Sequence, residues 1–352
     1  MLRYNPIRHE VGLIRIGNPG PDSPVLVSGN YFHTVKRLLA ELSGTDCYLL
    51  VADSAGINVW CAAGVCDFNE HKIADAVNSC GLAGIVSHRK LILPQLAAVG
   101  IDKKKLFEEC GFKSVWGPAA MYDIKKFLKD DMKASADMRV ASFPMNERWY
   151  NAVGMFGVFL LPVLISGAIF HKKFRKHLHF IVLMNFVNIF GNFIFYEKFP
   201  FKYPANNSMF LGFLTYTGIL FYTFFINPAA KAMLKFYLAA AAVVNFLVSI
   251  DMLGSTPFYK TTIAHWLKTF NNSSMFQPRV NEKCVKCLEC LKVCPKGIFE
   301  FENETLSVRL ERECCECLAC VKQCPARAIT NINGSYYKED IKSISGIDEL
   351  MR

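Results

Sequence analysis

The chain has 352 residues, of which 52% are hydrophobic, and a formal net charge of +10. It is too long for one small domain and more apolar than an ordinary soluble protein, so we expect several units of different character. The basic residues are scattered or flank apolar segments, which argues against nucleic acid and favours charge beside a membrane surface. With a polar N-terminus, the fourteen cysteines indicate a reducing, cytosolic setting rather than a secreted, disulfide-linked protein.

Residues 1–138 are predicted to form an α/β domain of the Rossmann-like kind, with a parallel sheet. Short β-rich runs alternate with helical patterns along this segment, and such alternation is typical of parallel sheets. The predicted strands are 24–30, 47–53, 84–86 and 114–116, and the predicted helices are 31–42, 71–80, 103–110 and 124–132. Parallel sheets bind ligands at the carboxyl ends of their strands, and the segment after Asp53 is such an end.

That segment, residues 56–64, reads GINVWCAAG. It contains no GxGxxG, so nucleotide binding has little support. It also lacks the Asp-x-His-x-x-Gly arrangement of proteins that bind cobalamin through histidine. From residue chemistry alone, Cys61 beside Trp60 and two alanines is predicted to be a small buried apolar residue. His71 and His88 lie near this segment in sequence, and a lone histidine is more often structural, so neither is given a role.

Residues 139–258 are predicted to be a transmembrane helical region of about four spans in a lipid bilayer. Four apolar stretches, each near the length that crosses a bilayer, lie at 153–170, 178–196, 209–226 and 232–252. An even number of crossings would put the flanking domains on one side, which we expect to be the cytoplasmic face of the inner membrane. The basic run HKKFRKH at 171–177 is predicted to be a loop on the opposite face, against the positive-inside tendency. Alternatively, the first stretch, interrupted by Pro162, is re-entrant.

Three asparagines, Asn185, Asn188 and Asn192, fall on one face of the second apolar stretch. Within a helical bundle such side chains either hydrogen-bond to neighbouring helices or line a polar cavity. The first role is the preferred prediction.

The C-terminal part contains two cysteine runs with the spacing of iron–sulfur ligands, and each run ends in a proline, Pro295 and Pro325. This is the pattern of bacterial ferredoxins with two clusters, in which the last cysteine of each run binds the other cluster. The predicted ligand sets for two [4Fe-4S] clusters are Cys284, Cys287, Cys290 and Cys324, and Cys294, Cys314, Cys317 and Cys320. Cys315 has no place in the pattern and is predicted to be a spare thiol beside the ligands. We expect a linker at 259–274, an α+β ferredoxin-like domain at 275–335 with a hairpin around Asn303, and a tail at 336–352.

One short motif resembles a known family. Asn58, Val59, Trp60, Cys61, Ala62, Ala63 and Gly64 spell the cap-helix signature of the corrinoid protein of the mercury-methylation pair. The similarity extends through GNPGPDSPVLVSGNY, HRKLILPQLAAVG and LGSTPFY. With the cysteine runs included, nearly the whole chain resembles that corrinoid protein fused to its dicluster ferredoxin partner, an HgcAB-like fusion.

The resemblance implies that Cys61 is the lower axial ligand of cobalt in a base-off corrinoid of the cobalamin type. The other residues of the motif, 58–60 and 62–64, would then pack against the macrocycle. A thiolate donates strongly, so it would favour an electron-rich cobalt that releases methyl with carbanion character. The clusters would supply low-potential electrons that return cobalt to its reduced state. A methyl-donating protein or cofactor and an upstream electron donor are the implied partners.

The chain departs from the family after Gly64, where Lys-Gly-Thr-Phe-Gly-Thr is replaced by VCDFNE at 65–70. Cys66 is predicted to be a core cysteine, with a second thiol near the cobalt face as the alternative. The family's ferredoxin partner carries further cysteines, to which mercury handling is attributed, whereas this chain has none after Cys324. Methyl transfer to an acceptor other than mercury is therefore the preferred prediction. The alternatives are mercury methylation by another Hg(II) route, and a membrane electron carrier without corrinoid.

Overall fold

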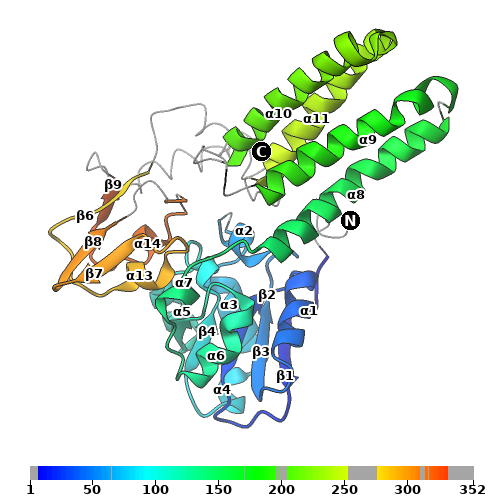
Figure 1. Ribbon diagram of the computed structural model, residues 1–352. Helices are drawn as coiled ribbons and strands as arrows, with labels where there is room; N and C mark the ends of the chain where they lie inside the picture. The colour runs from blue at the N-terminus through cyan, green and yellow to red at the C-terminus, as the bar shows by residue number, and fades with distance from the viewer. Residues whose placement is uncertain are drawn as a thin grey trace, which may run out of the picture. The chain divides into compact units, whose positions relative to one another are not determined.

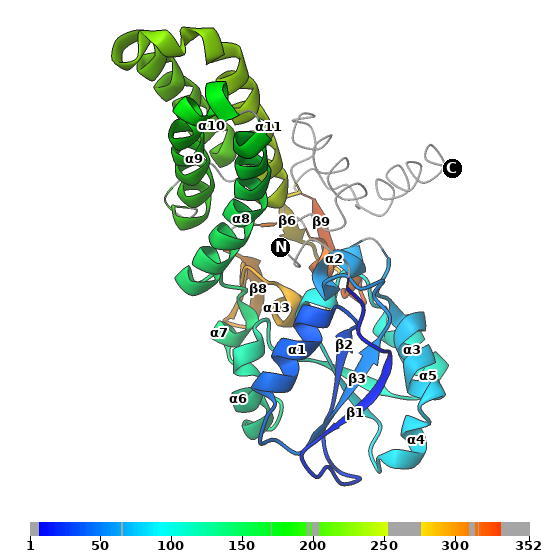
Figure 2. The same cartoon turned by 90° about the vertical axis from the view of Figure 1, so that its right-hand side faces the viewer.

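The computed structural model describes residues 7–64, 66–169, 171–195, 198, 204–252, 276–309, 314–315 and 317–331. The chain divides into two compact units (Figures 1 and 2). One unit consists of Pro6–Ser142 together with Tyr259–Arg352, and the other of Met1–Asn5 together with Phe143–Phe258. The predicted linker at 259–274 and the predicted tail at 336–352 lie outside the described residues.

The N-terminal part of the first unit is built on a five-stranded sheet in the order β1-β3-β2-β4-β5. The strands are β1 (Gly12–Ile16), β2 (Val25–Gly29), β3 (Cys47–Ala52), β4 (Lys90–Leu93) and β5 (Lys113–Trp116). The pairs β2–β3, β2–β4 and β4–β5 are parallel, whereas β1 runs antiparallel to β3 at the edge. The predicted α/β fold with a parallel sheet is confirmed, with one antiparallel edge strand added.

Both faces of the central strands are covered, which explains why β2 and β3 read as continuous apolar runs. Alternate residues of β3 enter two separate core clusters: Leu50 joins one and Leu49 joins the other. Helices α1 (Phe32–Glu41) and α6 (Ile124–Lys129) cover one face, and α3 (Glu70–Ser79) and α5 (Lys103–Cys110) cover the other (Figure 2). All four helices were predicted from the sequence.

The strand predicted at 84–86 is wrong, because Gly84 and Ile85 lie in a short helix, α4 (Leu82–Ile85), and Val86 is its C-cap. Gly81, with φ +60°, turns the chain after α3 directly into this extra turn. Three residues are too few for apolar periodicity to separate a strand from a helical turn. The shorter elements of this part are η2 (Gln95–Ala97), η3 (Met121–Asp123) and α7 (Ala136–Arg139).

The second unit consists of helices, and each of the four predicted apolar stretches falls mainly within one of them. The helices are α8 (Met145–Ile169), α9 (His171–Ile194), α10 (Pro204–Phe221), η4 (Tyr222–Ile226), η5 (Pro228–Met233) and α11 (Leu234–Met252). Among the described residues, two segments, Met209–Ile226 and Lys231–Val248, have the length and apolar composition needed to cross a membrane. Leu178–Ile194 is a shorter apolar stretch.

The basic run at 171–177 is not the loop that the sequence predicted, because it forms the first turns of α9. Lysine and arginine are good helix formers, so a basic run does not by itself end a helix. The helix α8 also continues without a break past Pro162.

The three asparagines of α9 are buried, with 6% of Asn185 and 1% of Asn188 and of Asn192 exposed. The Asn188 amide donates to the Thr215 hydroxyl of α10 at 3.5 Å, and Asn192 donates to the Asn188 backbone and side chain. Asn185 and Asn188 also line a small hollow together with Thr215 and Tyr237. Hydrogen bonding between helices is thus confirmed as one role of this face. The same asparagines also line the small hollow, which corresponds to the alternative prediction.

The C-terminal part of the first unit has two small antiparallel sheets. Strand β6 (Pro278–Val280) pairs with β9 (Ile329–Asn331), and β7 (Phe299–Glu302) pairs with β8 (Thr305–Val308). The β7–β8 hairpin confirms the predicted turn around Asn303. Asn303 and Glu304 both have positive φ, +48° and +59°, as a two-residue type I′ turn requires. Two short helices, α13 (Glu289–Val293) and α14 (Ala319–Lys322), complete this part.

The two cysteine runs fold as an internal repeat with a period of 30 residues. Leu288 before α13 and Leu318 before α14 have left-handed backbone, with φ of +59° and +61°. Gly297 and Arg327, at the next equivalent position, have φ of +59° and +51°. These matching left-handed positions give the described parts of the two runs the same turns, as the repeated spacing indicated.

Candidate functional site

The predicted site lies on a short helix, α2 (Val59–Gly64), which follows the carboxyl end of β3. In Figure 2, α2 lies beyond the ends of β2 and β3. Asn58 caps this helix: its side-chain oxygen accepts from the Trp60 amide at 3.0 Å, and its carbonyl accepts from the Ala62 amide at 2.9 Å. The sequence motif and the strand-end position therefore coincide, as expected for a binding segment of a parallel sheet.

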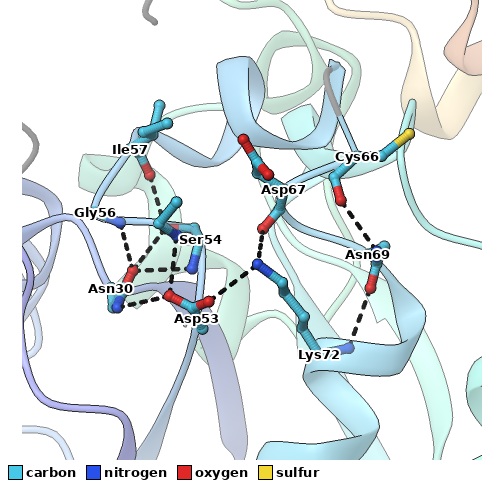
Figure 3. Close-up of polar contacts among 10 residues, drawn as sticks. Asn30, Asp53, Ser54, Gly56, Ile57, Cys66, Asp67, Asn69 and Lys72 are labelled. Carbon is cyan, nitrogen blue, oxygen red and sulfur yellow. Dashed lines mark hydrogen bonds and ion pairs between the residues drawn. The ribbon is translucent and has the colours of Figure 1, made fainter. Parts of the chain in front are cut away.

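Asn30, the residue directly after β2, organises the loop that leads to α2 (Figure 3). Only 2% of this residue is exposed. Its side-chain oxygen accepts from the Ser54 amide, the Ser54 hydroxyl and the Gly56 amide at 2.9–3.1 Å, and its amide nitrogen donates to Asp53 at 3.1 Å. One buried side chain thus satisfies the backbone of a turn that no neighbouring strand could pair.

Lys72 of α3 connects the segments on both sides of α2 (Figure 3). Its ammonium group donates to the Asp53 carboxylate and to the Asp67 carbonyl, both at 3.0 Å. Burial raises the pKa of Asp53, but the hydrogen bond and charge of Lys72, with the hydrogen bonds from the Ala55 amide and Asn30, together outweigh it and lower the pKa. Asn69 adds a second connection, because it caps α3 through the Lys72 amide and donates to the Cys66 carbonyl.

The motif residues divide between two faces of α2. Val59, Ala62 and Ala63 are buried in the core of the α/β domain, so this structure does not place them on a surface that a macrocycle could contact. Asn58 and Gly64 are exposed, and Trp60 and Cys61 are half-buried. Residues 58, 61 and 64 follow each other at helical spacing and form the open face. The prediction from residue chemistry that Cys61 is buried is wrong, since the buried alanines occupy the core side instead.

Gly100 allows the loop after η2 to pack directly against α2. A Cβ at this position would lie 2.5 Å from the Ala63 carbonyl oxygen and 2.8 Å from both the Ala63 Cα and the Phe68 carbonyl oxygen. All three are backbone atoms, which cannot rotate away. The position of α2 therefore depends on a glycine here.

Cys66 is exposed and has φ +62°, so its prediction as a core cysteine is wrong. It lies in the turn that leaves α2, and Figure 3 shows its thiol pointing away from the polar contacts around Asn69. The two histidines, which were given no role from the sequence, make polar contacts. His71 pairs with Glu109 at 2.7 Å, and the His88 ring contacts the Ser23 carbonyl at 2.9 Å.

The cysteines of the first predicted ligand set lie near one another. The pKa of Cys290 is raised to about 12, mainly by burial and in smaller part by the neighbouring thiols of Cys287, Cys324 and Cys284. These four include Cys324 from the other run, as the crossed pattern requires. Bound iron would reverse this effect, since a coordinating thiol is deprotonated.

The second set shows the same arrangement around Cys320. Burial raises its pKa, as do the nearby thiols of Cys314 and Cys294. Cys315 hydrogen-bonds to Cys317, and this contact lowers the pKa of Cys315 to about 7 despite its burial. It lies beside the ligand set, as predicted for a spare thiol.

No group of three or more His, Cys, Asp or Glu side chains within the described residues is arranged to hold a single metal ion. A [4Fe-4S] cubane needs its four thiolates further apart than a single ion does, because each of its four irons binds one thiolate at its own corner. The donor chemistry and the crossed grouping of these thiols fit two cubanes better than one mononuclear site.

Comparison with known proteins matches the two segments that contain these residues. Residues 3–128 match the family described as CO dehydrogenase/acetyl-CoA synthase delta subunit, and residues 278–336 match the 4Fe-4S dicluster domain. The chain thus joins a domain similar to corrinoid/iron–sulfur proteins to a 4Fe-4S dicluster domain. The family matches are consistent with the expected fusion, although they are not specific to it.

Individual relatives resemble only part of the chain. The acetyl-CoA decarbonylase/synthase complex subunit gamma of Archaeoglobus fulgidus is 30% identical over 137 residues, 36% of this chain and 29% of the relative. The corrinoid/iron-sulfur protein large subunit of Moorella thermoacetica is 31% identical over 129 residues, 36% of this chain and 28% of the relative. The chain therefore spans less than a third of the length of these relatives.

The sequence predicted only some of the residues that position α2. Asn30 and Asp53 could have been found, since each is a polar residue directly after a buried strand. Lys72 and Gly100 could not have been found, because their importance depends on segments that meet only in the folded chain.

Proposed function

We propose that this chain is a corrinoid iron–sulfur protein in which Cys61 is the lower axial ligand of cobalt, and that it transfers a methyl group. The open face of α2 is the observation that supports this most. It presents a half-buried thiol between two exposed small or polar residues, at the ligand-binding edge of a parallel sheet. The name of the Moorella thermoacetica relative, a corrinoid/iron-sulfur protein large subunit, supports the same cofactor class.

The bound corrinoid would supply a cobalt centre that accepts and releases a methyl group, while the protein would supply a rigid ligand. Asn30, Lys72 and Gly100 would all act by fixing the loop and helix that carry Cys61. A ligand on a short helix held from both ends keeps its orientation, which catalysis by a metal-bound group requires. A methyl-donating protein or cofactor completes the proposal.

We further propose that the crossed cysteine sets bind two [4Fe-4S] clusters and that these reduce cobalt. The sets are Cys284, Cys287, Cys290 and Cys324, and Cys294, Cys314, Cys317 and Cys320. The proximity of thiols from both runs supports this grouping. An upstream electron donor and anchoring in the inner membrane, with both flanking domains cytoplasmic, remain part of the proposal.

The acceptor is proposed to be a molecule other than mercury. The sequence has no cysteine after Cys324, and Hg(II) prefers thiolate ligands. The exposure of Cys66 beside α2 favours mercury methylation as the second candidate, because it offers a soft ligand near the proposed cobalt site. Formation of methylmercury by cells that express the chain, and its loss in Cys66→Ala, would favour this candidate over the first.

The deciding measurement is the cobalt and iron content of the full chain, purified in detergent and reconstituted with cobalamin and iron sulfide. We expect stoichiometric cobalt with a thiolate-ligand absorption spectrum in the native chain. Cys61→Ala should lose that spectrum and the methyl-transfer activity, while iron content stays unchanged. Cys80→Ala is the matched control, since it removes another half-buried thiol of the same domain. Full iron without any cobalt would contradict the proposal and leave a membrane electron carrier.

A further inference from the structure

Within the first unit, the ferredoxin-like part contacts the α/β domain through specific polar groups. The Lys103 ammonium lies 2.7 Å from the Glu289 carboxylate. The Gln323 amide donates to the carbonyls of Ala98 and Ile101, both at 2.7 Å. The Ala141 amide donates to the Pro295 carbonyl at 2.8 Å. Each bond joins a residue within or next to a cysteine run to a residue of the segment Pro6–Ser142.

The contact is also buried and apolar. Val293 and Ala319 belong to the same core cluster as the helices and strands of the α/β domain. The Glu289 side chain is only 18% exposed. The Glu289 carboxylate contacts the ammonium groups of both Lys103 and Lys292, at 2.7 and 2.8 Å. A partly buried carboxylate with two charged partners indicates a defined docking geometry.

This interface leads directly to the proposed corrinoid site. Gln323 binds the carbonyls on the two sides of Gly100, and Gly100 packs against the backbone of Ala63 in α2. Ala63 is two residues from Cys61. The ferredoxin-like part therefore holds the same loop that supports the cap helix.

The two cysteine runs differ in their surroundings. Cys317 packs against the core cluster that Val293 and Ala319 share with the α/β domain. Cys287 is instead exposed, in a loop whose Val285 is 64% exposed and whose Lys286 is also exposed. One set thus has a ligand at this shared core, while the other has a ligand at the surface.

We propose that Gln323 and the Lys103–Glu289 pair are docking residues that hold the ferredoxin-like part against the segment beneath α2, and that the set of Cys294, Cys314, Cys317 and Cys320 exchanges electrons with the corrinoid site. The set containing Cys287, which has an exposed ligand, receives them from a low-potential donor protein. Each transfer moves one electron, which lowers the oxidation state of cobalt by one. The donor protein then replaces this electron through the set containing Cys287. The inference rests on the proposed corrinoid function only for the direction of electron flow.

The docking is tested by amide hydrogen exchange on the full chain in detergent with both clusters loaded. Gln323→Glu is nearly isosteric but cannot donate to the two carbonyls once ionised. It should accelerate exchange in residues 97–103 and 319–324 by about tenfold or more, with iron content unchanged. Glu289→Gln should do the same. Lys322→Ala, an exposed neighbour, should have no effect. Unchanged exchange in both docking variants would overturn the docking.

The direction is tested by following reduction of bound cobalamin in the same protein by stopped-flow spectroscopy, with titanium(III) citrate as reductant. Electron paramagnetic resonance identifies which cluster each variant alters. Cys317→Ser should slow cobalt reduction by about tenfold or more relative to Cys287→Ser, as should Gln323→Glu relative to Lys322→Ala. The opposite order of the two serine variants would overturn the assignment. A native chain that binds no cobalt would refute the proposed function, whereas the exchange experiment would still decide the docking.

Discussion

Asn30→Ala should destabilise the α/β domain more than any other single polar substitution proposed for this site. The substitution leaves the amides of Ser54 and Gly56 buried without the oxygen that accepts from them. An unsatisfied buried amide costs about 1–3 kcal/mol, so we expect a loss of about 2–5 kcal/mol in the free energy of unfolding. Thermal unfolding of the full chain in detergent, followed by tryptophan fluorescence, measures this loss.

Two further variants sharpen the result. Asn30→Asp keeps an acceptor but places a carboxylate against Asp53, to which Asn30 now donates. This variant should also lose a substantial part of the free energy of unfolding while Asp53 is ionised. The loss should become smaller as Asp53 is protonated, because the repulsion between the two carboxylates then disappears. Asn78→Ala is the control, since its exposed amide makes one long bond of 3.4 Å. A change there should stay within about 0.5 kcal/mol. Equal effects of Asn30→Ala and Asn78→Ala would contradict the role given to Asn30.

Gly100→Ala should displace α2 and remove cobalt binding while leaving iron binding intact. The added methyl group would meet the backbone of Ala63 and Phe68 at 2.5–2.8 Å. Overpacking against groups that cannot rotate away costs about 1–3 kcal/mol, and the cheapest relief is movement of the short helix. Metal analysis and amide exchange of residues 59–64 report the two effects separately.

Gly84→Ala is the matched control for Gly100→Ala. It places the same methyl group in helix α4, where no atom lies within 4 Å. Alanine is the better helix former, so this variant should be neutral or stabilising by up to about 1 kcal/mol. If Gly100→Ala bound cobalt as well as Gly84→Ala does, the loop would not be needed to position α2.

The sequence predicted the regular parts of this molecule because their signals are local. Helix α5 was predicted with its observed bounds, since Asp102 caps its start and Gly111, with φ +74°, ends it. The β7–β8 hairpin followed from a polar pair between two alternating runs. Strand β4 was missed because the three apolar residues before Pro94 fit a strand or a buried helical turn equally well.

The candidate site was predictable only in part. Six residues of α2 are too few to show helical periodicity, so its motif was recognised by resemblance rather than by pattern. The division of that motif into a core face and an open face depends on which side meets the sheet. Gln323 and Gly100 are far apart in the chain. No local sequence pattern near either residue predicts that Gln323 binds the loop that contains Gly100. Contacts of this kind arise only when distant segments pack.

The carbonyls held by Gln323 have a consequence for assembly of the protein. Domains whose fold depends on bound metal are unfolded or loose until the metal arrives. In a cell short of iron, Gln323 would then no longer hold the carbonyls of Ala98 and Ile101. Helix α2 would lose part of its support as a result. By linkage, whatever stabilises one cofactor site through this loop also tightens the other. Iron supply would thereby set the order of maturation, with cluster insertion first and tight corrinoid capture after it.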